Sequence, residues 1–388
     1  MSNYRIPFVN YPRAYKKIKP EIDDALLGCL ERGDLVYRQD LIDFEKNFAA
    51  YCGCKHGIGT GSCTGAMYLC LRVINVFLRE VITVSHTYIA TIDSIVHAGG
   101  IPVLIDVDYD TMNMDVDQLE RAITPQTQAI MPVHLNGRMC EMDRIMEIAE
   151  RYKLYVIEDA AQAAGAEYKW KMAGSWGHFG CFSFYPAKIL GSYGEGGMIV
   201  TNDDEMASKL YLLRDHGEWP HYLPGGKKGE IYGWGYNSIL DNIQAAVLNV
   251  KLRYLPETKG ERQGIADKYS AGFREIEMAN CIAQPYGTMF KAPDDDPFDT
   301  DLADIFQNYV IKIKKRDKLK NYLTQRGIET LISWATPNHK QKGLPDLHHF
   351  KLPVTEQISN EVLSLPMHPE LTDPEVEYIV EAVRSFFR

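Results

Sequence analysis

The sequence lacks the features that mark a membrane-spanning or a secreted protein. Nowhere do about 18 consecutive apolar residues occur, so no segment is expected to cross a membrane. The N-terminal residues contain no apolar core of a secretory signal. Eight cysteines in 388 residues are too sparse for a disulfide scaffold. These absences predict a cytoplasmic protein that does not bind membranes.

No Cys-x-x-Cys pair is present to suggest a zinc site. Cys52, Cys54 and His56 lie close together along the chain, but no fourth ligand stands near them. We interpret these cysteines as buried or half-buried thiols, and we predict that the protein has no metal site.

The chain also has fewer basic than acidic residues, with 42 Lys and Arg against 52 Asp and Glu. The formal net charge is −10 at pH 7, whereas a nucleic-acid-binding protein needs a basic face to displace counterions from phosphates. We therefore expect no nucleic-acid partner. With 45% hydrophobic and 24% charged residues and no long Pro, Ser or Gln tract, the composition is that of a folded protein.

Short apolar runs alternate with amphipathic stretches from about residue 55 to residue 200. This alternation is typical of an α/β domain built around a mostly parallel sheet, in which ligands bind beyond the carboxyl ends of the strands. The predicted strands are 81–85, 101–107, 129–135, 155–159, 180–185 and 197–202. The predicted helices between them are 64–73, 90–98 and 142–153.

A long helix is predicted from about Leu240, because Ile243, Val247 and Val250 repeat every three to four residues until Pro256 intervenes. We place the domain boundary at this helix. The prediction is a large α/β domain over residues 1–250 and a smaller α+β domain over residues 251–388. Within the smaller domain we expect a polar surface loop at 290–301, a strand at 308–314 and helices at 317–326 and 374–387.

A glycine-rich turn runs into a predicted helix at residues 57–73. Small residues let backbone N–H groups approach an anion and the helix N-terminus adds a favourable dipole, so this segment can cradle a phosphate with Thr64 as a hydroxyl donor. The glycines also resemble a dinucleotide fingerprint, but the preceding YCGCKH is not an apolar strand. On this segment alone, a phosphate cradle and a plain connection both stay open.

Asp159 ends the predicted apolar strand at 155–159. A carboxylate in that position can pair with a protonated ring nitrogen, as pyridoxal chemistry requires, because the pyridinium must stay protonated to accept electrons. Gln162 follows three residues later and can contact the ring from the same side. The alternative is an aspartate that caps a surface helix.

Lys188 follows Pro186 in a loop bounded by glycines, just after the predicted strand at 180–185. A lysine in a restricted and partly desolvated site has a lowered pKa and can form an imine with an aldehyde. Ser183 lies on the same strand and can hold a phosphate. A lysine in a loop is otherwise a solvated charge, and the neighbouring motifs are what favour the imine.

These motifs occur in the order found in the DegT family of sugar aminotransferases, which the chain resembles. The motifs are the phosphate turn, EDAAQ at 158–162, FSFYPAK at 182–188 and GYNSILDNIQAAVL at 235–248. Further similar segments lie at 85–115, 132–137, 214–217 and 363–372, so the resemblance covers nearly the whole chain. SWATPNHKQ at 333–341 departs from the His-Tyr-Pro run of many members, which leaves the sugar and the nucleotide open.

The resemblance implies a pyridoxal 5'-phosphate-dependent transferase of fold type I, similar to aspartate aminotransferase, that forms a homodimer with shared active sites. It implies that Lys188 is the Schiff-base lysine, that Asp159 pairs with the pyridine nitrogen and that Gln162 contacts the ring. Tyr88 matches the aromatic residue that stacks on the cofactor. Cys63, Thr64 and Ser183 match phosphate-binding positions, and Asn237 matches a residue that reaches the phosphate from the neighbouring subunit. The candidates for contacts to the substrate are Tyr185, His339 and Lys227, the last beside Lys228.

The resemblance further implies that an amino donor, usually glutamate, aminates a nucleotide-linked keto-deoxysugar by a ping-pong course through pyridoxamine phosphate. One alternative is a sugar dehydratase of the same fold, but related dehydratases are expected to carry histidine in place of Lys188. Another is a non-catalytic sensor that binds pyridoxal phosphate, which would predict an appended domain. The sequence does not decide the sugar, the nucleotide, amination at C3 or C4, or a polysaccharide or antibiotic pathway.

Overall fold

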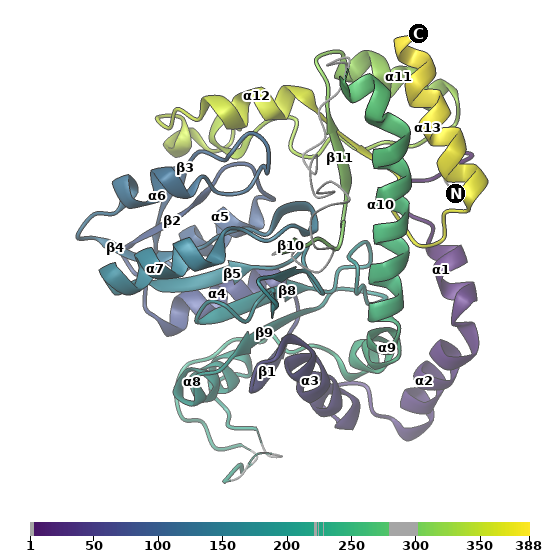
Figure 1. The fold of residues 1–388 in the computed structure, drawn as a ribbon. Coiled ribbons are helices and arrows are strands. Elements are labelled where there is room, and N and C mark those ends of the chain that lie inside the picture. Colours follow the sequence, from purple (N-terminus) through teal and green to yellow (C-terminus); the bar gives the residue numbers. More distant parts are fainter. Residues whose placement is uncertain (1–3, 221–222, 224, 228, 279–301) are drawn as a thin grey trace.

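The computed structural model describes residues 4–220, 223, 225–227, 229–278 and 302–388, so Lys228 and the predicted loop at 290–301 lie outside the described residues. Within these ranges the main sheet has seven strands in the order β1-β9-β8-β5-β4-β2-β3 (Figure 1). The strands are β1 (His56–Thr60), β2 (Glu80–Val84), β3 (Ile101–Ile105), β4 (Thr127–Ile130), β5 (Tyr155–Asp159), β8 (Phe179–Ser183) and β9 (Gly197–Thr201).

The sheet is mostly parallel, as predicted. The neighbours β8, β5, β4, β2 and β3 run parallel, whereas β9 pairs antiparallel with both β8 and β1. β1 is not among the predicted strands, because HGIGT contains two glycines and only one large apolar residue. Glycine is required there by close packing, since a Cβ on Gly57 would lie 2.3 Å from the carbonyl oxygen of Glu45.

β4 is shorter than the predicted strand at 129–135 and ends at Ile130. Pro132 has no N–H to give to a ladder, so regular pairing cannot continue through it. Leu135–Gly137 then form a 3-10 turn in which Asn136 has a φ of 58°. The chain therefore leaves the sheet as a compact turn at the edge where the functional residues gather.

Helices cover both faces of the sheet. Successive side chains of a strand point to opposite faces, so Val156 of β5 packs in one core cluster and Ile157 in another. Val156 shares its cluster with residues of α3, α6 and α7, and Ile157 shares its cluster with residues of α4, α5 and α8. These helices are α3 (Gln39–Cys52), α4 (Cys63–Val73), α5 (Ala90–His97), α6 (Val116–Ala122), α7 (Met142–Tyr152) and α8 (Asp204–Arg214).

The predicted long helix is present as α9 (Asn242–Arg253), and a second helix follows it directly. α10 (Leu255–Met278) begins immediately after it, with Pro256 in its first turn. Proline is tolerated there because the first N–H groups of a helix have no intrahelical partner. The predicted helix thus ends at Arg253, before Pro256, as expected, and the separate helix that follows it, α10, is the longest helix of the described residues. Figure 1 shows α10 running from α9 towards α11 and α13.

A second hydrophobic core lies among the C-terminal elements. Tyr269 and Phe273 of α10 pack there against Tyr309 and Ile379, and Ile6 from the N-terminal segment joins them. The elements are β11 (Tyr309–Lys312), α11 (Arg316–Gln325), α12 (Pro353–Glu361), β12 (Val362–Leu365) and α13 (Asp373–Phe387). The remaining ones are α1 (Tyr11–Lys17), α2 (Lys19–Arg32) and the small sheet of β6 (Glu167–Tyr168), β7 (Lys171–Met172) and β10 (Leu302–Ala303). The division at residue 250 stays a prediction.

None of the helices in the described part of the chain is both long and apolar enough to cross a membrane. Among the same residues, no group of three or more His, Cys, Asp or Glu side chains is arranged to hold a metal ion. His56 instead contacts Asp204 at 2.7 Å through Nε2.

Candidate active site

Lys188 is held in a tight turn that follows β8. The backbone N–H of Lys188 donates to the carbonyl oxygen of Tyr185 at 2.8 Å, which closes a four-residue turn. Pro186 is the second residue of that turn, where its fixed φ is favoured. The chain after Lys188 is also closely packed, since a Cβ on Gly191 would lie 2.4 Å from the carbonyl oxygen of Pro186. The sequence therefore presents Lys188 on a constrained loop.

The environment of Lys188 disfavours its charged form. The side chain is half-buried, and desolvation lowers the pKa of its amine below the ordinary value. The negative charge of Asp159 opposes that shift. A lysine with a lowered pKa is more often neutral near pH 7, and the neutral amine is the nucleophilic form.

Asp159 is buried at the carboxyl end of β5, with 5% of its surface exposed. Its Oδ2 accepts a hydrogen bond from the Thr91 hydroxyl at 2.7 Å, and its Oδ1 accepts one from the Ala161 N–H at 3.2 Å. Burial raises the pKa of this carboxyl, while these two donors and the Lys188 charge lower it. A cationic partner would favour the ionised form further.

The N-terminus of α4 packs tightly against β9. A Cβ on Gly197 would lie 2.5 Å from the backbone nitrogen of Cys63, so only glycine allows this approach. Ser62 caps the helix by accepting from the Gly65 N–H at 3.1 Å. Cys63 and Thr64 begin the first turn, and Thr64 is partly exposed. A helix N-terminus of this kind attracts an anion.

Two further predicted residues lie at the same edge of the sheet. Ser183 ends β8 and its Oγ accepts from the Tyr185 N–H at 3.3 Å. Gln162 accepts a hydrogen bond of 2.7 Å from the Asn136 N–H through Oε1, which fixes the orientation of its amide. Asp159 ends β5 and Ser183 ends the neighbouring parallel strand β8, and Lys188 follows in the turn after β8, so these residues lie at one edge of the sheet.

Three of the predicted residues have exposed side chains. Tyr88, four residues after β2 ends at Val84, is 65% exposed, and Tyr185 in the lysine loop is 47% exposed. Asn237 is exposed and forms an isolated bridge with Asp215. A side chain that binds a ligand must be reachable, and all three meet that condition.

His339 and Lys227 lie in very different surroundings. The His339 side chain is fully buried, with Nδ1 2.8 Å from the Ser85 hydroxyl and Nε2 3.2 Å from Glu356. Both ring nitrogens are thus engaged by the protein itself. Lys227 is exposed in the loop between α8 and α9 and contacts Glu230 at 3.3 Å.

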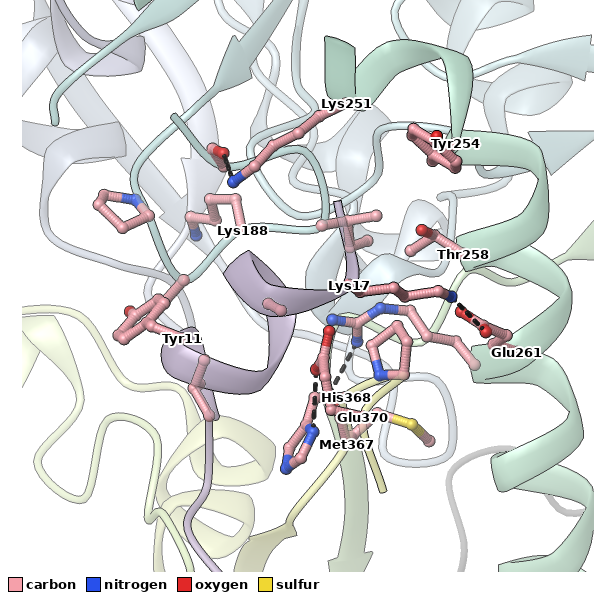
Figure 2. Close-up of a pocket in the computed structure, with 18 of the residues that line it drawn as sticks. Tyr11, Lys17, Lys188, Lys251, Tyr254, Thr258, Glu261, Met367, His368 and Glu370 are labelled. Atoms are coloured by element: carbon pink, nitrogen blue, oxygen red, sulfur yellow. Dashed lines mark hydrogen bonds and ion pairs between the residues drawn. The ribbon is translucent and has the colours of Figure 1, made fainter. Parts of the chain in front are cut away.

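A cavity of about 130 Å³ adjoins the lysine loop (Figure 2). Lys251 donates a hydrogen bond of 2.6 Å from Nζ to the carbonyl oxygen of Gly191, shown as a dashed line in Figure 2. Burial lowers the pKa of Lys251 to about 8. Arg262, on another wall, donates to the backbone of Phe306 and Met367 at 2.8 and 2.9 Å. The cavity therefore places a second lysine beside the loop that carries Lys188.

Comparison with known families settles which group of proteins shares this arrangement. The model of the DegT/DnrJ/EryC1/StrS aminotransferase family matches residues 16–384. The chain belongs to this family. The resemblance that the motifs indicated is thereby confirmed, and so is the prediction of a sugar aminotransferase family.

The similarity to individual members of the DegT family covers nearly the whole chain. A dTDP-3-amino-3,6-dideoxy-alpha-D-galactopyranose transaminase from Aneurinibacillus thermoaerophilus is 40% identical over 382 residues, covering 98% of this chain and 99% of its own. The crystal structure of DesV from S. venezuelae, in complex with a ketimine intermediate, has a TM-score of 0.90 at 35% identity and covers 99% of both chains. The predicted fold type I architecture is confirmed by this match.

A second solved relative carries a cofactor. NtdA from Bacillus subtilis, with bound PMP, has a TM-score of 0.87 at 28% identity and covers 99% of this chain and 86% of its own. The residues present here fit that group. Asp159 is a buried carboxylate with neutral hydrogen-bond donors, which suits a protonated ring nitrogen, and the N-terminus of α4 suits a phosphate.

Sequence reasoning missed two residues that hold these groups in place. Thr91 donates to Asp159, and Gln307 contacts the backbone on both sides of Lys188. Thr91 has a local signal, because it stands four residues after Thr87 at the start of α5. Gln307 has none, since it lies 118 residues from Ile189 in the chain.

Proposed function

We propose that this chain is a pyridoxal 5'-phosphate-dependent aminotransferase that converts a nucleotide-linked keto-deoxysugar to the amino sugar, with glutamate as the amino donor. The similar dTDP-sugar transaminase from Aneurinibacillus thermoaerophilus supports the substrate class. The observation that carries the proposal is that the buried Asp159 and the loop with Lys188 follow one another at the carboxyl ends of the neighbouring parallel strands β5 and β8.

Lys188 is proposed to bond the cofactor and later to carry the proton. Bound at this site, pyridoxal phosphate supplies an electron sink for the carbon that bears the amine. Desolvation lowers the pKa of the Lys188 amine and so makes its proton easier to lose, which suits a group that accepts a proton at one carbon and returns it at another. Removal of the Lys188 amine would remove both roles.

Asp159 is proposed to hold the ring nitrogen protonated. Its carboxylate has one hydroxyl donor and one N–H donor but needs a cation to offset burial. Gln162 is proposed to contact the ring, with its amide already oriented by the Asn136 N–H. Tyr88 is proposed to stack on the ring, for which its exposed face is available.

The phosphate is proposed to bind at the N-terminus of α4. Cys63 and Thr64 supply the first N–H groups of that helix, and Thr64 and Ser183 supply hydroxyls. Asn237 is proposed to complete the site from the second subunit of a homodimer. The segment before Asn237 supports an intersubunit role, because Trp234 is 96% exposed and Tyr232 57% exposed.

The substrate side of the site is proposed to include Tyr185 and Lys227. Tyr185 is exposed beside Lys188, and Lys227 is an exposed cation on a loop that can meet a diphosphate. His339 was predicted to contact the substrate as well. Its two bonds, to Ser85 and Glu356, favour a role in positioning the segment after β2 instead.

A half-reaction with the amino donor alone tests the proposal. Purified protein loaded with pyridoxal phosphate and given only glutamate should release 2-oxoglutarate in an amount equal to its cofactor content. Lys188→Ala should release none. A panel of nucleotide-linked keto-sugars added next should yield one amino sugar, and its analysis identifies the sugar, the nucleotide and the aminated carbon.

The two alternatives predict different results in the same assay. A dehydratase would eliminate water from a sugar substrate and return the cofactor without net transfer of nitrogen. A non-catalytic sensor would bind pyridoxal phosphate but release no keto acid with any amino donor. Release of 2-oxoglutarate without subsequent amination of any keto-sugar would contradict the proposed substrate class.

A further inference from the structure

Gln307 contacts the chain on both sides of Lys188. Its Oε1 accepts a hydrogen bond of 3.1 Å from the Ile189 N–H, and its Nε2 donates one of 2.9 Å to the carbonyl oxygen of Ala187. Ala187 and Ile189 are the immediate neighbours of Lys188. One side-chain amide therefore satisfies one backbone group before the lysine and one after it.

The chemistry of the two partners fixes the orientation of the Gln307 amide. An N–H group can only donate and a carbonyl oxygen can only accept, so exchanging the oxygen and nitrogen of the amide would break both bonds. The pair of contacts thus requires an amide at this position. A carboxylate retains only the acceptor, and an apolar side chain retains neither.

The backbone of Gln307 is itself held firmly by the turn at Asn136 and Gly137. The Ile305 N–H donates to the carbonyl oxygen of Gly137 at 3.0 Å, and Asn308 Nδ2 donates to Asn136 Oδ1 at 3.0 Å. A Cβ on Gly137, where φ is 92°, would lie 2.8 Å from the Gln307 nitrogen. This close approach leaves Gln307 little freedom to move.

The same segment also connects to the other side of the site. Asn308 contacts Asn136, and the Asn136 N–H donates to Gln162 Oε1 at 2.7 Å. Gln307 and Asn308 are consecutive, so one dipeptide is linked by side-chain hydrogen bonds to the lysine loop and, through Asn136, to Gln162. The relative placement of these two parts therefore depends on residues just before β11.

We propose that Gln307 is a positioning residue for Lys188, which fixes the backbone from which the amine projects. The inference rests on the role proposed for Lys188 and goes beyond it, because nothing in the motifs around Lys188 points to a residue 118 positions after Ile189. Gln307 acts through Ala187 and Ile189 and is not assigned a contact to the substrate or the cofactor.

The matched control is Gln263, on α10. Its Nε2 donates to the Asp304 carbonyl oxygen at 3.0 Å, so it is also a glutamine that bonds the backbone of the segment before β11. Among the residues that the structure describes, its side chain makes no hydrogen bond to the lysine loop. Gln263→Leu therefore reproduces the loss of an amide next to this segment without the loss of the contacts to Ala187 and Ile189.

The first test uses hydrogen–deuterium exchange of the protein without cofactor. In Gln307→Leu the Ile189 amide should exchange about five- to tenfold faster than in wild type, because one hydrogen bond is lost. Gln307→Glu keeps the acceptor and should leave exchange at Ile189 within about twofold of wild type. Gln263→Leu should not change it. Equal exchange at Ile189 in wild type and Gln307→Leu would overturn the proposal.

The second test uses the protein loaded with pyridoxal phosphate. Gln307→Leu should lower kcat by about tenfold or more while the KM for glutamate stays within about twofold, because misplacement of the amine affects reaction more than binding. Gln307→Glu should shift the pH midpoint of the absorbance of the lysine-bound cofactor upwards, since it places a negative charge near the amine. Absence of any lysine-bound cofactor in wild type would refute the proposed function, whereas the exchange result would still decide the role of Gln307.

Discussion

The Thr91 hydroxyl donates its hydrogen to Oδ2 of Asp159 across 2.7 Å, at the carboxyl end of β5. The hydroxyl of Thr87 lies 2.8 Å from that of Thr91. Because Thr91 has a single hydroxyl hydrogen and gives it to the carboxylate, Thr87 is the donor in the second bond. Two buried hydroxyls thus form a chain that favours the ionised carboxylate.

Thr91→Val removes the donor while keeping the shape of the side chain. A hydrogen bond to a charged group contributes about 1.5–3 kcal/mol, so we expect cofactor affinity to fall by about 10- to 100-fold. The pKa of Asp159 should rise further, because the Thr91 hydrogen bond that lowers it is lost. The ionised carboxylate is the form that pairs with a ring cation, so as the pH falls the affinity for the cofactor should drop at a higher pH than in wild type. Titrating apoprotein with pyridoxal phosphate at several pH values measures both effects.

Thr83→Val is the matched control for that experiment. Thr83 is buried in β2 and donates to the Met131 carbonyl oxygen at 2.8 Å, without contact to Asp159. If Thr91→Val and Thr83→Val changed the Kd for the cofactor by the same factor, the hydroxyl chain would have no specific role in cofactor binding.

Lys251 should make stability depend on pH in a defined window. Its pKa in the folded chain is about 8, below the ordinary value of 10.5, so between these values the unfolded chain binds more protons. Stability therefore rises with pH from about 8 to 10.5, while below about 8 the penalty for the buried charge is fully present. Lys251→Met should show a smaller rise in the free energy of unfolding than wild type, as measured by urea denaturation at pH 7.5 and 9.5.

The exposed residue Lys46 provides the comparison for Lys251. Lys46→Met should show the same rise in the free energy of unfolding between the two pH values as wild type. A wild-type slope retained in Lys251→Met would mean that burial does not lower the pKa of Lys251.

A shared active site predicts complementation between two inactive variants. Lys188→Ala lacks the amine and Asn237→Ala lacks the residue proposed to come from the second subunit. In a mixed dimer one site receives wild-type Lys188 from one chain and wild-type Asn237 from the other. Random mixing in equal amounts should then restore about a quarter of wild-type activity, from half of the dimers with one working site each.

The outcome of this mixing experiment also shows whether Asn237 acts in its own subunit or in the neighbouring one. Each variant unfolded and refolded alone supplies the control, and both should stay inactive. If co-refolding restored nothing although size measurements showed mixed dimers, Asn237 would act within its own chain, where the adjacent Ser238 lies close to Gly65.

The strands and helices that surround the site were largely predictable from sequence. β5 coincides with the predicted strand at 155–159, and α4, α5 and α7 agree with their predictions to within one residue at each end. Buried parallel strands and amphipathic helices carry strong local patterns, which is why they are found. β1 was missed because glycines that permit close packing against α3 also weaken its strand pattern.

The contacts of the side chains in the site were harder to predict from the sequence. The motifs indicated Lys188 and Asp159 but not the contacts that hold them, which come from Gln307, 118 residues from Ile189 in the chain, and from Thr91, 68 residues from Asp159. Burial was also not predictable, since His339 stands in a polar segment yet is fully enclosed. Long-range hydrogen bonds depend on how the elements pack, and a local pattern does not record that.

The most direct test of the account is to find which lysine bonds the cofactor. Protein loaded with pyridoxal phosphate is reduced with borohydride, digested and mapped by mass spectrometry. The mass of the reduced cofactor is expected on Lys188 and not on Lys17 or Lys251, the other two lysines that line the adjoining cavity. Label on Lys17 or Lys251, or no covalent label on any lysine, would contradict the account.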